Sequence, residues 1–174
     1  PPISTLFPYT TLFRSITSPV DWGYNCIAWA VGDYQKWWWP TPSPNPFYYW
    51  PDGVPREESL EAFAAAYATE GFVKCRNGRL ETNYEKVALY AKRDSGELLP
   101  THASRQLPDG RWTSKLGPCE DIEHSTTEAV HGPVYGSTVC YMKRSRPGFA
   151  PRAGFSIVGW FSGMFENISG WLCN

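Results

Sequence analysis

The sequence predicts an α+β domain in which an N-terminal helix carrying a cysteine packs on a small antiparallel sheet. After Asn25, apolar side chains recur at the spacing of one helical face as far as Trp38. Segments 87–91, 101–107 and 111–116 read as strands separated by turn residues. The helix precedes the strands, so helix and sheet are segregated along the chain, as in α+β domains.

The first fifteen residues are expected to be an artefact. Residues 5–15 resemble the in-frame translation of a common short-read sequencing adapter, and residues 1–4 are close to a continuation of the same oligonucleotide. Such a scar is set aside from fold reasoning. It indicates a metagenomic gene whose natural N-terminus is missing. The natural protein could therefore have carried a signal peptide that this sequence lacks.

Composition sets loose limits on class and partners. A chain of 174 residues suits one domain, and a net charge of −1 gives no reason to expect nucleic acid as a partner. The five cysteines include no C-x-x-C pair, which argues against a zinc ribbon and a secreted disulfide framework. The cytoplasm is therefore the expected compartment. No apolar run reaches the roughly eighteen residues of a transmembrane segment, and the oligomeric state is left unknown.

The expected first helix begins after Asn25, a good N-cap, and ends near Trp39, because a following proline disfavours helix. Alternating prolines and aromatic residues then occupy 37–51. We expect a packed loop that covers the core, and the alternative is one wall of a substrate cleft. A second helix is expected from Pro55 to Gly71.

The remaining elements follow in order. The predicted segments are a strand over 72–75, the Asn77-Gly78 turn, three strands joined by turns at 94–96 and 108–110, an acidic turn and helix start at 120–123, a short helix over 125–130 and a last strand over 135–143. We place the domain at 16–146, and a linker and an amphipathic helix at 147–174.

Cys26 and His102 are the candidate catalytic pair. Cys26 lies in the first turn of the expected helix, where the helix dipole and free N–H groups stabilise a thiolate. His102 begins a strand, and an imidazole there could take the thiol proton and later protonate the leaving group. The alternatives are a buried structural cysteine and a hydrogen-bonded structural histidine.

The order of cysteine helix, histidine strand and hairpin resembles papain-like cysteine hydrolases, and NlpC-type cell-wall peptidases in particular. The short matches lie at 24–31 and 86–117. The resemblance implies a papain-like fold with a third polar residue after the hairpin, at the position of Ser114. Serine departs from the His, Asn or Asp expected there, so Asp121, Glu123 or His124 could orient the imidazole instead.

Further site residues follow from this arrangement. Backbone N–H groups at the helix start, with the side chain of Asn25 or Tyr24, could hold an oxyanion. Ser104 and Gln106 alternate with His102 along the expected strand and would line the same side.

The chain also resembles an uncharacterised bacterial family, a domain of unknown function, over about residues 22–144. The matching motifs are Asn-Cys-Ile-Ala-Trp-Ala, the triple Trp, Tyr-Glu-Lys, Thr-His-Ala, Leu-Pro-Asp-Gly-Arg-Trp-Thr-Ser-Lys-Leu-Gly and Asp-Ile-Glu-His. This resemblance implies no known activity.

No metal or other cofactor is predicted. Cys119, His124 and His131 lie near one another in the sequence, but their spacing fits no zinc pattern. Two functional interpretations remain. One is a Cys–His hydrolase or acyltransferase acting on a peptide or amide bond, and the other is a non-catalytic papain-like binding domain.

Deleting residues 1–15 should leave the melting temperature unchanged, because an arbitrary translated oligonucleotide has no evolved partner surface. Thermal unfolding of the full and shortened chains, followed by circular dichroism, measures this. A fall of several degrees would count against the artefact assignment.

Overall fold

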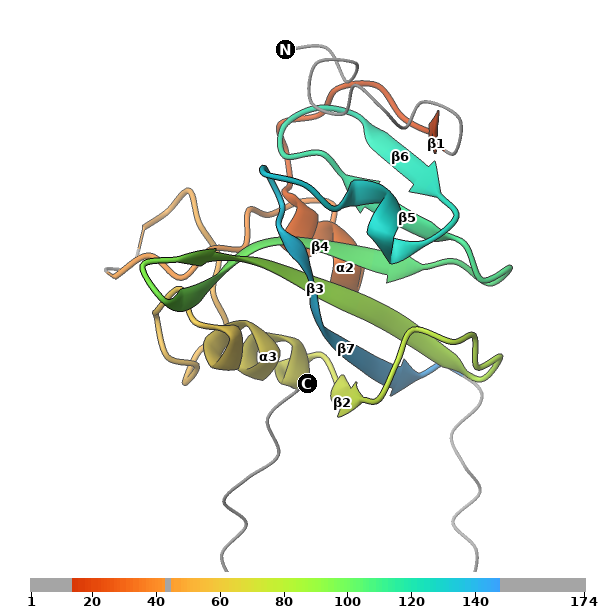
Figure 1. Ribbon diagram of the computed structural model, residues 1–174. Helices are drawn as coiled ribbons and strands as arrows, with labels where there is room; N and C mark the ends of the chain where they lie inside the picture. Colours follow the sequence, from red (N-terminus) through yellow and green to blue (C-terminus); the bar gives the residue numbers. More distant parts are fainter. Residues whose placement is uncertain (1–13, 43–44, 148–174) are drawn as a thin grey trace, which may run out of the picture.

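The computed structural model describes residues 14–42 and 45–147 (Figure 1). Its strands are β1 (Arg14–Ile16), β2 (Val73–Cys75), β3 (Tyr84–Asp94), β4 (Glu97–Gln106), β5 (Trp112–Lys115), β6 (Asp121–His124) and β7 (Ser137–Ser145). They form one seven-stranded antiparallel sheet in the order β1-β6-β5-β4-β3-β7-β2. The helices are α2 (Cys26–Val31), α3 (Leu60–Thr69) and the 3-10 helix η2 (Thr127–Val130).

The central strand β3 is buried on both faces. It pairs with β4 on one side and β7 on the other, and its residues from Lys86 to Ala91 are all buried. Val87 and Leu89 belong to a core with α2 and α3, whereas Ala88 and Tyr90 belong to a second core on the opposite face. The sheet therefore separates two cores, and the side chains of one strand alternate between them.

The predicted α+β, papain-like fold is wrong. The two α-helices have only 6 and 10 residues, and the seven-stranded sheet dominates the described part of the chain. The architecture is closer to all-β. No helix among the described residues is long and apolar enough to cross a membrane.

The expected first helix is much shorter than its apolar spacing indicates. It ends at Val31 because Gly32 adopts a left-handed conformation with φ 88° and donates its N–H to carbonyls of the last turn. The chain then doubles back, and the N–H of Trp38 donates to Asn25 Oδ1 at 3.2 Å. The aromatic residues beyond Gly32 therefore pack as a loop and not as a helical face.

Two elements at one end of the sheet also differ from the prediction. The acidic stretch expected as a turn and helix start is strand β6, because residues 121–124 pair with β5 and residues 122–124 also pair with β1. Arg14 and Ser15 pair with β6, although they fall within the predicted artefact. Residues 1–13 and the predicted C-terminal helix lie outside the described residues, so these two assignments stay predictions.

The loop rich in proline and aromatic residues is a packed cover, as predicted. The exposed fractions of Trp38 and Trp50 are only 2% and 3%. Trp39 and Trp50 each meet the ring of Phe63 on α3 edge-on, with ring centroids 5.4 and 5.2 Å apart. The loop thus closes the core on the helical face of the sheet.

Gly78→Ala should lower the free energy of unfolding by about 1–3 kcal/mol through overpacking. An added Cβ would lie 2.7 Å from Tyr141 Cε1 and 2.9 Å from Trp112 Cζ2. Both rings are held, because Trp112 is buried and the Tyr141 hydroxyl is 2.9 Å from the hydroxyl of Thr127. Urea denaturation measures the change, and Arg79→Ala at an exposed neighbour is the control. A variant as stable as the wild type would contradict the close packing.

Candidate functional site

Cys26 begins α2 as predicted, but its surroundings oppose ionisation. Asn25 caps the helix, and its side chain accepts a hydrogen bond from the N–H of Ala28 at 3.1 Å. Burial raises the pKa of the Cys26 thiol from 9.0 to about 11, and the backbone of Ala103 and the charge of Lys115 lower it only in part. At neutral pH, Cys26 is therefore a protonated thiol.

His102 is enclosed by aromatic rings. Its own ring stacks on Tyr135 at 4.1 Å between centroids and meets the edge of Tyr90 at 5.2 Å. Neither ring nitrogen has a hydrogen-bond partner within the described part of the chain. Burial, and next the neighbouring His124, lower the pKa of His102 from 6.5 to about 3. The imidazole is therefore neutral at physiological pH.

Cys26 and His102 pack mainly against different neighbours, although Tyr135 interacts with both. Cys26 packs in the same core as Ala103, the residue that follows His102. Because successive side chains of a strand alternate, the His102 ring lies toward Tyr90 and Tyr135 of the second core. A thiol–imidazole hydrogen bond is absent, since both ring nitrogens lack a partner among the described residues. Catalysis by this pair remains a prediction.

The expected oxyanion donors have other roles. Asn25 Nδ2 donates to the carbonyl of Trp38 at 2.9 Å, and Asn25 Oδ1 accepts from two backbone N–H groups. The Tyr24 hydroxyl donates to Asp121 Oδ2 at 3.0 Å, and burial, followed by this carboxylate, raises its pKa. Both side chains tie separate segments of the chain together.

Ser114, the expected third catalytic residue, pairs with His124 and not with His102. Its hydroxyl lies 2.9 Å from His124 Nε2, and His124 Nδ1 lies 2.7 Å from the carbonyl oxygen of Thr126. If Nδ1 carries the proton, Nε2 accepts from the serine, which is the arrangement of a serine nucleophile and its base. The exposed fractions of Ser114 and His124 are 0% and 1%, so a substrate has no access to the pair.

The two residues expected beside His102 are also buried and bonded. The Ser104 hydroxyl lies 2.9 Å from that of Tyr90, and Gln106 Nε2 donates to the carbonyl of Gly78 at 2.7 Å. Ser104 is directly opposite Ser114 across the β4–β5 pair. Ser104 and Gln106 thus both make hydrogen bonds within the fold.

Asp121 has a partner that sequence reasoning missed. Lys115 is fully buried, with Nζ 3.8 Å from Asp121 Oδ1 and 4.9 Å from the centre of the Tyr24 ring. Lys115 Nζ also donates to the carbonyl of Cys119. The available signal was a lysine at the end of a strand whose other residues are buried. Buried lysines are rarely unpaired, so an acidic partner for Lys115 could have been expected.

Among the residues that the structure describes, no group of three or more His, Cys, Asp or Glu side chains could hold a metal ion. Four pockets on the surface of the described residues have volumes of about 370–390 Å³, and neither Cys26 nor His102 lines any of these four. One of them is lined by three arginines that are not among the predicted site residues: Arg105, Arg144 and Arg146.

Residues 15–143 match the model of a family described as Domain of unknown function (DUF7689). The chain belongs to this family. The match runs from within β1 into β7 and so includes both cores and all the predicted site residues. The match to DUF7689 confirms the predicted resemblance to a domain of unknown function, and the family description names no activity. No curated protein and no solved structure matches the chain.

His102→Phe should remove part of the acid sensitivity of this DUF7689 domain. The folded pKa of about 3 is below the ordinary 6.5, so only the unfolded chain takes up a proton at His102 as pH falls between these values. The wild type should therefore lose, through His102, roughly 1.4 kcal/mol per pH unit in that window.

The measurement is urea denaturation of both proteins at several pH values from 7 downward. Phenylalanine keeps the ring stack and omits two unbonded nitrogens, so stability at pH 7 should be kept or increased. Equal pH slopes for the two proteins would show that His102 is not held neutral by the fold.

Proposed function

We propose that the domain acts by binding a ligand and does not use Cys26 for covalent catalysis. One observation carries this proposal. Cys26 and His102 are both buried, and burial drives each toward its neutral form, with a pKa of about 11 for Cys26 and about 3 for His102. A cysteine hydrolase needs the opposite, a lowered thiol pKa beside a base within hydrogen-bonding reach.

The other predicted site residues support the same conclusion. In an active site, some hydrogen-bonding groups must be free to meet the substrate. Here the side chains of Asn25, Ser114 and Gln106 each make a hydrogen bond within the fold. Their partners lie 13, 10 and 28 residues away along the chain, and such bonds are typical of buried groups that stabilise a fold.

The competing prediction is a Cys–His hydrolase or acyltransferase that acts on a peptide or amide bond. The capped helix start at Cys26 supports it, because such a position favours a thiolate. For Cys26 the desolvation is the larger effect, since the net pKa change is upward. Cysteine reactivity therefore separates the two functions.

Alkylation by iodoacetamide at pH 7.5 should modify Cys26 more slowly than the partly exposed Cys75 and Cys119. A pKa of about 11 against the ordinary 9.0 leaves about 100-fold less thiolate, and burial slows access further. Mass spectrometry of peptides from timed samples measures each rate. Alkylation in urea, where all thiols are exposed, is the control.

His102→Ala provides the decisive comparison. In a binding domain, this change should not slow the alkylation of Cys26, and a vinyl-sulfone probe should label the wild type no more than Cys26→Ala. Preferential labelling of Cys26 that depends on His102 would overturn the proposed function and favour the hydrolase.

A further inference from the structure

A pocket of about 390 Å³ lies where the C-terminal end of α2 meets the ends of β4 and β7. Its lining residues are Val31, Gly32, Glu85, Arg105, Gln106, Leu107, Pro108, Arg144 and Arg146. Three guanidinium groups thus share one hollow with a single carboxylate. Such a concentration of positive charge on a chain of net charge −1 suggests a site for an anion.

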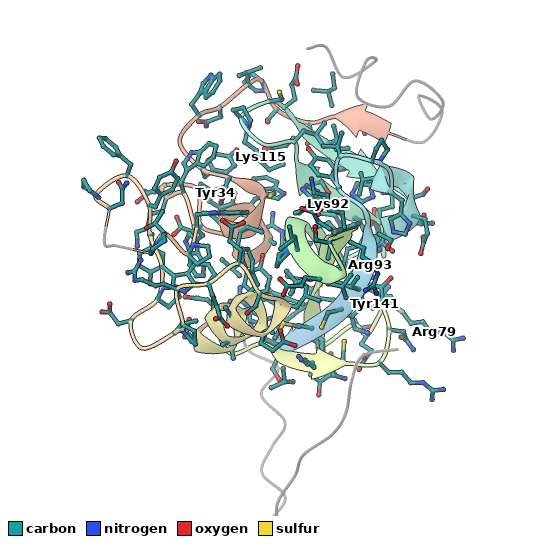
Figure 2. All side chains as sticks on the ribbon, turned by 60° about the vertical axis from the view of Figure 1, so that its left-hand side comes forward. Tyr34, Arg79, Lys92, Arg93, Lys115 and Tyr141 are labelled. Atoms are coloured by element: carbon teal, nitrogen blue, oxygen red, sulfur yellow. The ribbon has the colours of Figure 1, made fainter. Side chains whose placement is uncertain are left out.

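Arg105 is held in place without being neutralised. Its guanidinium lies over the ring of Trp29 at 4.8 Å, and Nη1 donates to the Tyr34 hydroxyl at 3.2 Å. Figure 2 labels Tyr34, which follows α2 in the chain. Within the described ranges, Arg105 has no ion pair. Aromatic stacking fixes the orientation of the planar group and leaves its full charge available.

Arg146 is the second cation of this pocket that has no acidic partner among the described residues. Its Nε donates to the carbonyl of Thr82 at 3.2 Å, and its backbone N–H donates to Asn83 at 2.9 Å. These bonds fix the position of the side chain. The terminal nitrogens of its guanidinium have no described hydrogen bond, so they can serve as donors toward the pocket.

The third arginine is already compensated. Arg144 Nε donates to Glu85 Oε2 at 2.7 Å, and Arg144 Nη2 donates to the carbonyl of Val31 at 3.2 Å. Glu85 is the acidic residue of the pocket, so this pair cancels its repulsion of an anion. The bond to Val31 also offsets the negative end of the α2 dipole. Arg144 Nη1 also lies 3.8 Å from Oε2 of Glu70, which does not line the pocket. Arg105 and Arg146 are therefore the lining cations without an acidic partner among the described residues.

We propose that this pocket binds a small organic anion through a carboxylate or phosphate group held by Arg105 and Arg146. Guanidinium groups suit both oxyanions, because their N–H donors match two oxygens at once. Leu107 and Pro108 form an apolar wall beside these donors and suit the organic part of the ligand. This inference rests on the proposed binding function and names its ligand class.

Isothermal titration calorimetry of the full chain in a low-salt buffer tests the proposal. The probes are inorganic phosphate, phenyl phosphate and citrate, which separate the phosphate from the carboxylate and reveal any contribution of an apolar group. At least one probe should bind saturably, at one site. Arg105→Gln and Arg146→Gln should each weaken that binding about 10–100-fold, the usual worth of a charge-assisted hydrogen bond.

Arg93→Gln is the matched control. Arg93 is exposed near the β3–β4 hairpin (Figure 2), at the end of β3 opposite Glu85. Its side chain donates to the carbonyl of Gly96 and has no ion pair among the described residues. The Arg93→Gln substitution should change the affinity for the anion less than twofold. Should Arg105→Gln fail to fold, Arg105→Lys keeps the charge, loses the planar donor pair and should still weaken binding about tenfold.

Saturable binding to none of the probes, or equal affinity for the Arg105 and Arg93 variants, would overturn the anion site. Either result would leave the binding function standing if Cys26 is slow to react. Reactive Cys26 would instead remove the proposed function whatever the titration shows, so the two failures are distinguishable.

Discussion

The burial of β3 on both faces is the constraint on which the rest of the structure depends. A strand that is paired on both sides and buried on both faces needs two separate covers. On one face the cover is α2, α3 and the aromatic loop, and on the other it includes η2 and Tyr135. Short helices are enough to cover this face of the sheet, because each helix fills only a part of one layer.

Two covers explain why the predicted catalytic residues Cys26 and His102 are both buried in this fold. β4 lies beside β3, so its alternating side chains enter both cores, and His102 and Ala103 go to opposite ones. A buried polar group must find a partner or lose its charge. Ser114 and His124 find each other, Lys115 and Asp121 lie close as an ion pair, and His102 stays neutral between aromatic rings.

At the ends of β4 and β7, charged side chains are only partly buried. There the strands leave the covers, and arginine side chains reach partly exposed positions. Arg144 is neutralised by Glu85, whereas Arg105 is stabilised by an aromatic ring, which holds a cation without cancelling its charge. Unpaired charge is thus found at the edge of the cores, on partly exposed side chains.

The sequence by itself determined the local features of this protein. The Asn25 cap, the apolar run 87–91 and the hairpin turn at 108–110 depend on neighbouring residues, and each was predicted correctly. The family resemblance was also visible in short motifs. Gly32 could have been recognised as a helix end, but the apolar spacing beyond it favoured a longer helix.

Only the tertiary structure decided what surrounds Cys26. The dipole of a capped helix start lowers a thiol pKa and burial raises it, and the sequence contains the first effect but not the size of the second. Cys26 shares its core with residues of α3, β4 and the aromatic loop, all of which lie outside its own helix. The strand β6 depended likewise on partners in β1 and β5. Such distant contacts set both pairing and desolvation, and local sequence does not encode them.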